Sequence, residues 1–359
     1  MIFTPESLSE DRPRLVYLDS LRGLAALWVF FFHMIFLAQP NLAIPEIFWP
    51  LRVGGMGVTL FFIISAFCLC LTMPRHIQNE RWLLSFYTHR ACRILPLFYT
   101  VLAINTYFLT SRGVDVPLDK ILINVTCLFN FIPGEQTSLV MAGWVIGVEV
   151  IIYAIFPILY KFFNTLSKSI ILFIVSWIIG VLAKQFITDH AYYQWSILRH
   201  FPIFTGGIVL FYAIEKIQNI DLRFRNLLGW TLCLSFIPTY KYLDMISAIP
   251  GMAYYAQLIP FGLLLTGLSI TPLPVLVSYP AALLGKMSYS VYLLHPLVII
   301  KTMHVYPKIY ALDLGVTVSF ALCACLTLSV LLPLAYISYV YIEKPGIDLG
   351  KWLVRREWK

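Results

Sequence analysis

Residues 15–37 read LVYLDSLRGLAALWVFFFHMIFL. Apart from one tyrosine, the only ionisable side chains in this stretch are Asp19, Arg22 and His33. A helix needs about 20 mostly apolar residues to cross a bilayer, so the stretch is long enough to span a membrane. Charged residues precede it up to Arg14, and it has no small-residue cleavage site. We therefore expect a retained first span rather than a cleaved signal peptide.

Similar apolar runs recur along the whole chain. Of its 359 residues, 60% are hydrophobic and 12% are charged, whereas roughly a quarter of the residues in a soluble protein are charged. The sequence predicts an all-α, polytopic membrane bundle of about ten transmembrane helices, which fills residues 1–359 as a single domain. The segment 120–132 is apolar but too short to cross, which is typical of a re-entrant or interfacial helix. The expected spans are 15–37, 55–73, 92–111, 141–163, 169–187, 199–215, 227–241, 252–270, 286–304 and 314–342.

The distribution of positive charge indicates the orientation. With a cytoplasmic N-terminus, 18 of the 26 Lys and Arg residues fall on the inner side, as the positive-inside rule requires. Both termini are then cytoplasmic. The net charge of +8 reflects basic cytoplasmic loops, and no basic-aromatic surface indicates a nucleic-acid partner. The other 8 cations are Arg52, Arg112, Lys120, Lys184, Arg199, Lys241, Lys301 and Lys308.

Three ionisable residues share one face of the first expected span. Eleven residues separate Arg22 from His33, which returns to nearly the same helix face about 16 Å further along. Asp19 lies three residues before Arg22. Arginine suits phosphate or carboxylate, and a neutral imidazole can accept a proton from a hydroxyl. In the alternative interpretation, Arg22 extends to the interface and His33 is an interhelical hydrogen-bonding residue.

Two further arginines, Arg90 and Arg93, lie at an expected cytoplasmic helix start, three residues apart. At this spacing they are neighbours on one helix face. They suit an anionic phosphate donor, and they equally suit the positive-inside rule.

Glu149 lies early in the fourth expected span, with Tyr153 four residues on and on the same face. A carboxylate inside a membrane needs a partner, either a cation or a substrate hydroxyl. A structural ion pair is the simpler alternative.

The ninth expected span places Ser288, Tyr292 and His295 on one face. Pro296 follows His295 and leaves a backbone carbonyl without its helical donor, so local hydrogen bonding is a strong alternative for His295. The motif Glu343-Lys344-Pro345 ends the tenth span and is typical of a helix stop.

The cysteines predict no metal or redox site. They include C-x-C pairs within apolar runs, not the C-x-x-C spacing of metal ligands, and we expect small core residues. Asn124-Val125-Thr126 is formally a glycosylation sequon. The cysteines are Cys68, Cys70, Cys92, Cys127, Cys233, Cys323 and Cys325.

Together these residues resemble the acyltransferase-3 family of integral-membrane O-acyltransferases, over essentially the whole chain. The resemblance departs from the family pattern at Ala66, where a Gly is usual, and at Val145-Ile146, where Ser-Leu is expected. The five matching parts, in family order, are Leu18–Gly23 with His33, Leu60–Phe67, Arg90–Pro96, Trp144–Glu149 with Tyr153 and Pro157, and Gly285–His295 followed by Ile342–Pro345.

The resemblance implies ten spans in a bacterial inner membrane. It implies an acyl-CoA donor that is reached from the cytoplasm, with acetyl-CoA as the expected donor. The acceptor would be a hydroxyl of a carbohydrate or another polar molecule. The residues matching essential family positions are Arg22, His33, Arg90 and Arg93, and Glu149 matches a glutamate that is commonly implicated.

Two other classes of membrane protein are alternatives to an acyltransferase. A secondary transporter or exporter also places ionisable residues at mid-membrane, but usually shows inverted repeats, and no repeat is evident here. A structural or sensory membrane protein has no need for a stripe of basic and imidazole groups. The acceptor, the acyl chain, the choice between direct transfer and an acyl-enzyme, and the oligomeric state are open from the sequence.

Overall fold

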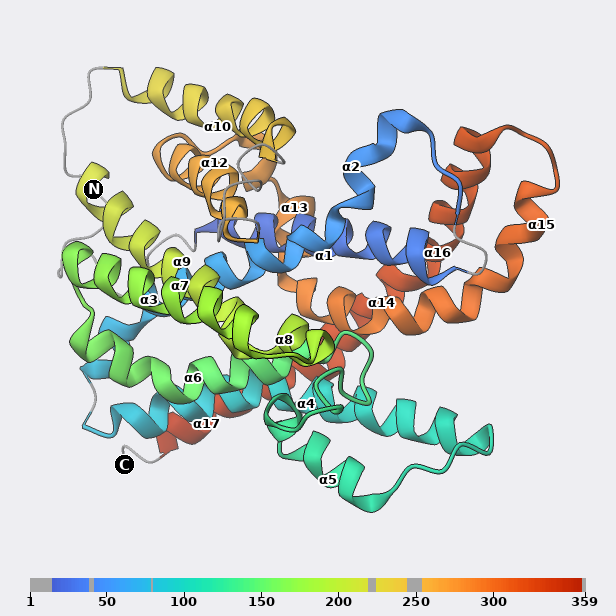
Figure 1. Cartoon of the computed structure of the whole chain (residues 1–359), viewed down its shortest axis with the longest axis horizontal. Coiled ribbons are helices and arrows are strands. Elements are labelled where there is room, and N and C mark those ends of the chain that lie inside the picture. The colour runs from blue at the N-terminus through green and yellow to red at the C-terminus, as the bar shows by residue number, and fades with distance from the viewer. Residues whose placement is uncertain (1–14, 39–41, 79, 219–223, 244–253, 357–359) are drawn as a thin grey trace. The chain divides into compact units, whose positions relative to one another are not determined.

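The computed structural model describes residues 15–38, 42–78, 80–218, 224–243 and 254–356, and these form helices joined by turns, without a strand among them (Figure 1). The α-helices are α1 (Val16–Leu37), α2 (Trp49–Arg52), α3 (Gly57–Ile77), α4 (Trp82–Ser111), α5 (Leu118–Val125), α6 (Trp144–Phe162), α7 (Leu166–Phe186), α8 (His190–Trp195), α9 (Ile197–Gln218), α10 (Arg225–Lys241), α12 (Leu258–Ile270), α13 (Tyr279–Lys286), α14 (Ser288–Thr302), α15 (Tyr306–Tyr310), α16 (Val316–Ser338) and α17 (Lys344–Arg356). A π-helix, η8 (Tyr339–Glu343), joins α16 to α17. The 3₁₀ turns are η2 (Glu46–Phe48), η3 (Gly54–Met56), η4 (Leu128–Phe131), η5 (Tyr255–Gln257), η6 (Pro274–Val277) and η7 (Met303–Val305).

Within the described residues, 7 helical stretches are long and apolar enough to cross a membrane. The pair α13 and α14 is bent by 68° and would be an eighth if it formed one span. The predicted all-α, multi-span membrane architecture is therefore confirmed. The 7 stretches are Val16–Leu37, Glu46–Ile77, Trp82–Ser111, Trp144–Phe162, Leu166–Phe186, His190–Ile217 and Val316–Arg355.

Two predicted spans are shorter in the structure than a crossing requires. Helix α10 has 17 residues and α12 has 13, against the roughly 20 needed for a span. The start of the predicted span 252–270 lies outside the described residues, as do both chain ends. The count of ten and the cytoplasmic placement of the ends therefore stay predictions.

The chain divides into two compact units. The first unit comprises Met1–Arg22, Thr59–Leu83 and Ile151–Gly285, and in it α7 packs along α9 and α10 along α12. A Cβ on Gly207 of α9 would lie only 2.8 Å from the Ala66 Cβ and 2.8 Å from the Ile63 carbonyl oxygen. Close helix packing at the position where Ala66 departs from the family glycine is thus provided by the glycine opposite.

The second unit comprises Gly23–Val58, Leu84–Val150 and Lys286–Lys359, and in it α14 packs against α16. The start of α3 approaches α1 closely, because a Cβ on Gly57 would lie 2.7 Å from the Ala25 carbonyl oxygen. The Tyr289 hydroxyl donates to the Ile94 carbonyl at 2.9 Å and joins α14 to α4.

The segment between α4 and α6 is held together by a buried asparagine. The Asn124 side chain accepts from the Ser138 hydroxyl at 2.6 Å and the Leu139 N–H at 2.9 Å, and donates to the Lys120 carbonyl at 2.9 Å. Asn124 is 0% exposed, so its amide is not accessible to a glycosylating enzyme in the folded protein. In the same segment, burial raises the pKa of the Cys127 thiol to about 11. This cysteine therefore stays protonated at neutral pH.

Candidate active site

Two histidines from distant parts of the sequence meet in the second unit. His33 on α1 and His295 on α14 place Nδ1 and Nε2 3.0 Å apart, with ring centroids 4.9 Å apart. His295 is fully buried and His33 is partly buried. The same Nδ1 of His33 lies 3.0 Å from the Val29 carbonyl oxygen, one helical turn earlier. Two separate candidates from the sequence are therefore direct neighbours.

The contacts of His33 fix where its proton lies. The Val29 carbonyl only accepts, so Nδ1 of His33 must carry the hydrogen and donate it. The Nε2 of His295 lies on the same Nδ1 and can accept a share of that hydrogen in a three-centre arrangement. In a neutral ring, Nε2 of His33 then keeps its lone pair. Among the described residues, no group lies within hydrogen-bond distance of that nitrogen. A nitrogen with such a lone pair can accept a proton.

The remaining nitrogen of His295 must then carry the proton of that ring. This nitrogen, Nδ1, is buried and has no hydrogen-bond partner among the described residues, although the carbonyls of Tyr292 and Val291 lie near the ring. Pro296 has no N–H, so it leaves the Tyr292 carbonyl without its helical donor. Among the described residues, the hydrogen bond that His295 makes is therefore the one to His33, and not the local bond considered as its alternative.

Tyr292 and Glu149 belong to the same neighbourhood. The Tyr292 ring lies 5.7 Å from the His295 ring, and its hydroxyl donates to the Ala142 carbonyl at 3.1 Å. Ala142 has φ of 65°, a left-handed conformation that few non-glycine residues adopt. Glu149 on α6 lies within electrostatic range of Tyr292 and is partly buried. The structure thus brings four sequence candidates together around α14.

A buried carboxylate from η8 contacts α14. Glu343 is 3% exposed and accepts a hydrogen bond from the Ser290 hydroxyl, which also contacts the Ser338 hydroxyl at 3.1 Å. The expectation that Glu343-Lys344-Pro345 stops a helix is wrong. The chain continues through the π-helix η8 into α17, since a wider turn accommodates the missing N–H of Pro345.

Arg90 and Arg93 lie within α4, not at its start. The helix begins at Trp82, well before the apolar run, because residues 82–91 are compatible with helix although they are too polar to be recognised as a span. Both arginines are partly buried, and the Arg90 guanidinium lies 5.6 Å from the Phe86 ring centre. Gly346 packs against Cys92 between them, so this cysteine is a packing residue.

Asp19 and Arg22 lie on the first turns of α1, within the first unit, and both are partly buried. This part of α1 is anchored by hydrogen bonds from the Ser20 hydroxyl to the Leu276 carbonyl at 2.6 Å and between the Tyr17 and Ser269 hydroxyls at 2.9 Å. The end of α13 packs so closely that a Cβ on Gly285 would overlap the Asp19 backbone.

Two other candidates do not join the histidine pair. The Tyr153 hydroxyl lies 3.3 Å from the Ser65 hydroxyl within the first unit. Ser288 is buried at the start of α14, and no contact recorded among the described residues links it to His33 or His295.

One buried histidine, His200 on α9, escaped the sequence analysis. Both of its nitrogens have partners: Nε2 lies 3.1 Å from the Gln194 carbonyl and Nδ1 lies 2.9 Å from the Tyr254 hydroxyl. The signal was available, since His200 is an ionisable residue in an apolar run just before Pro202, as His295 is before Pro296.

Comparison with known proteins identifies the family. The acyltransferase-3 family model, described as an acyltransferase domain, matches residues 15–336. An uncharacterized protein of Haemophilus influenzae is 26% identical over 223 residues, which cover 54% of this chain and 90% of that protein. A protein of Acidianus two-tailed virus named "Putative acetyltransferase ORF330" is 23% identical over 316 residues, which cover 84% of this chain and 87% of that protein. No solved structure matches. The chain belongs to the acyltransferase-3 family, and is thus a membrane enzyme that transfers acyl groups other than aminoacyl groups.

Proposed function

We propose that the protein transfers an acyl group, an acetyl group in the first place, from acyl-CoA to a hydroxyl of a carbohydrate or another polar acceptor, with His33 as the general base. The observation that carries this proposal is the environment of His33. Its Nδ1 is held by Val29 and His295, whereas its Nε2 has no partner among the described residues.

The proposed step is a direct transfer. Nε2 of His33 takes the proton of the acceptor hydroxyl as the oxygen attacks the thioester carbonyl. The carbon–sulfur bond breaks, and the CoA thiolate leaves and recovers the proton from the imidazolium. While His33 is charged, its Nδ1–H faces two acceptors, the Val29 carbonyl and Nε2 of His295, and both stabilise the cation. A positioned general base contributes about 10²–10⁴-fold in rate.

The donor would be held by arginines. Arg90 and Arg93, with Arg22, carry planar guanidinium groups that bind phosphate oxygens in pairs and stay charged when partly buried. In this proposal they bind the phosphates of CoA from the cytoplasm. Glu149 would interact with the acceptor hydroxyl or help to hold the residues around Tyr292.

The same proposal includes the topology of the chain: ten transmembrane helices in a bacterial inner membrane, with both chain ends in the cytoplasm. The distribution of Lys and Arg in the sequence supports the orientation. Labelling of single cysteines introduced near the two chain ends, in sealed vesicles of known orientation, would test it.

The direct experiment follows labelled acetyl from acetyl-CoA into an acceptor in purified full-length protein. The His33→Ala variant should lose acceptor-dependent transfer, and His304→Ala, at an exposed histidine, is the matched control. Full transfer by the His33 variant would exclude this base. Label trapped on the wild-type protein without acceptor would instead indicate an acyl-enzyme.

A secondary transporter is not favoured, because the acyltransferase match covers residues 15–336. Thermal stabilisation by a non-reactive CoA thioether separates the two classes. The unfolding midpoint of an acyltransferase should rise with the logarithm of the ligand concentration above Kd, whereas that of a transporter of unrelated substrates should not change.

A further inference from the structure

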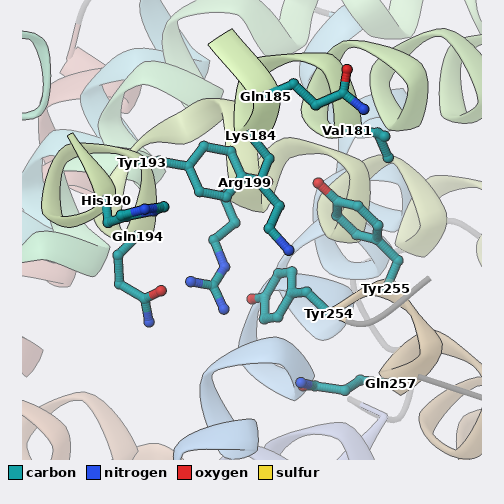
Figure 2. Close-up of a pocket in the computed structure, with 10 residues that line it drawn as sticks. All are labelled: Val181, Lys184, Gln185, His190, Tyr193, Gln194, Arg199, Tyr254, Tyr255 and Gln257. Atoms are coloured by element: carbon teal, nitrogen blue, oxygen red, sulfur yellow. The ribbon is translucent and has the colours of Figure 1, made fainter. Parts of the chain in front are cut away.

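The first unit contains a cavity of about 640 Å³ that none of the steps above uses (Figure 2). Its walls come from the end of α7, from α8, from the first turn of α9 and from the turn before α12. This volume falls within the range of small-molecule sites, roughly 300–1,000 Å³. The polar side chains that line it include Lys184, Gln185, Gln194, Arg199, Tyr254 and Gln257.

Two cations line this cavity. Arg199 and Lys184 both line it (Figure 2), and no carboxylate among the described residues lies within ion-pair distance of either. The nearest acid in sequence, Asp189, is engaged as the cap of α8, where it accepts from the Tyr192 N–H at 3.0 Å. Two cations in one concave site, with no carboxylate partner in the described part of the chain, favour an anionic ligand.

One wall of the cavity is rigid. His200 is 3% exposed, and its Nε2–H donates to the Gln194 carbonyl, which only accepts. Its Nδ1 therefore accepts from the Tyr254 hydroxyl at 2.9 Å. The Tyr254 ring is thus held in place, and the Arg199 guanidinium lies over it at 4.4 Å from the ring centre. A preorganised arginine loses little freedom when it binds a ligand.

The other polar groups suit hydroxyls. Gln185 and Gln194 are exposed amides with both donors and acceptors. The Gln257 side-chain oxygen is occupied by the Thr59 hydroxyl at 2.6 Å, which leaves its N–H groups to face the cavity. Cations, amides and a half-buried aromatic ring form a lining that suits a charged and hydroxyl-rich molecule.

We propose that this cavity binds an anionic saccharide, a sugar that carries a carboxylate or a phosphate, and that this sugar is the acyl acceptor. That the bound sugar is the acyl acceptor rests on the proposed function, whereas the chemical class of the ligand does not. Lys184 and Arg199 also belong to the cations that the sequence places on the outer side, away from a cytoplasmic CoA donor.

The test uses purified full-length protein in lipid nanodiscs and three probes: methyl glucuronide, glucose 6-phosphate and neutral methyl glucoside. At least one anionic probe should bind at least tenfold more tightly than the neutral sugar, and less tightly as salt increases. The Arg199→Gln variant should lose about tenfold to hundredfold of that affinity, as expected for a charged hydrogen bond. Arg112→Gln and Lys308→Gln, at exposed cations outside the cavity, are the matched controls for Arg199→Gln and Lys184→Gln.

The two anionic probes separate carboxylate from phosphate recognition. Equal binding of all three sugars, no binding of any, or unchanged affinity in both Arg199→Gln and Lys184→Gln would overturn the inference. A loss of affinity for a CoA thioether in Arg199→Gln would assign the cavity to the donor, and would overturn it as well.

Failure of this inference is distinguishable from failure of the proposed function. If acetyl transfer depends on His33 but is insensitive to Arg199, only the cavity assignment fails. If Arg199 binds anionic sugars while acetyl-CoA supports no transfer, the proposed function fails and the ligand class of the cavity stands.

Discussion

Each of the two units holds a histidine on a long apolar helix, and these two histidines, His200 and His33, differ in what their nitrogens contact. In the first unit, both nitrogens of His200 have partners, the Gln194 carbonyl and the Tyr254 hydroxyl. In the second unit, Val29 and His295 both contact Nδ1 of His33, and Nε2 has no partner among the described residues. A ring with both nitrogens engaged can hold its neighbours in place, whereas a ring held by one nitrogen can exchange a proton through the other. The contrast separates a positioning residue from a candidate base.

The largest expected effect is the difference in turnover between variants of His33 and variants of His200. His33→Gln should lower transfer by about 10²–10⁴-fold, because the amide cannot take up a proton. His200→Gln should lower it by less than tenfold and act mainly on the acceptor KM. Steady-state kinetics with labelled acetyl-CoA would compare them, with His304→Gln as the control at an exposed position. Equal losses of kcat in the two variants would remove the distinction.

A second prediction concerns His295 as a positioning residue. His295→Ala should lower kcat by roughly 10–100-fold, because His33 loses one of the two acceptors that stabilise its charged form. His295→Gln, whose side-chain oxygen can occupy the place of Nε2, should recover part of that loss. The two variants should differ in kcat but not in donor KM. If alanine and glutamine at this position behave alike, the contact is only a packing contact.

A third prediction concerns the buried carboxylate of the second unit. Ser290→Ala removes a hydrogen-bond donor from Glu343, which is 3% exposed. The free energy of unfolding should fall by about 1.5–3 kcal/mol, the contribution of a hydrogen bond to a charged group. Thermal unfolding in detergent would measure this, and Ser329→Ala, at an exposed serine of α16, is the control. No shift relative to that control would contradict the role of the Ser290–Glu343 contact.

The smallest expected effect is at Tyr254. Tyr254→Phe keeps the ring under Arg199 but removes the hydroxyl that donates to His200. Stability should fall by about 0.5–1.5 kcal/mol, the net value of one hydrogen bond. Tyr279→Phe, at a side chain that is 76% exposed, is the control for the thermal unfolding measurement. An unchanged midpoint would mean that the Tyr254 ring is fixed by packing alone.

The sequence predicted the features that depend on residues close together in the chain. Apolar length and low charge predicted an all-helical membrane protein, and the residue spacing on α1 singled out Arg22 and His33. Helix limits were less accurate, because α4 begins at Trp82 in a stretch too polar for a hydropathy criterion. The π-helix before Pro345 was also missed, since a proline ordinarily indicates the end of a helix.

The long-range contacts of the site could not be predicted in this way. His33 and His295 are separated by 262 residues, and Ser290 and Glu343 by 53. No helical periodicity relates residues on different helices, so the sequence could nominate both histidines but could not pair them. His200 was not singled out, although it lies at the start of the predicted span 199–215.

The measurement that tests the account most directly is the tautomer of the two histidines, read from nitrogen-15 chemical shifts in lipid bilayers and assigned with His33→Gln and His200→Gln. We predict a protonated Nδ1 and an unprotonated Nε2 for His33, and the reverse for His200. A proton on Nε2 of His33 in the resting protein would contradict the account, because that nitrogen could not then accept a proton from an acceptor hydroxyl.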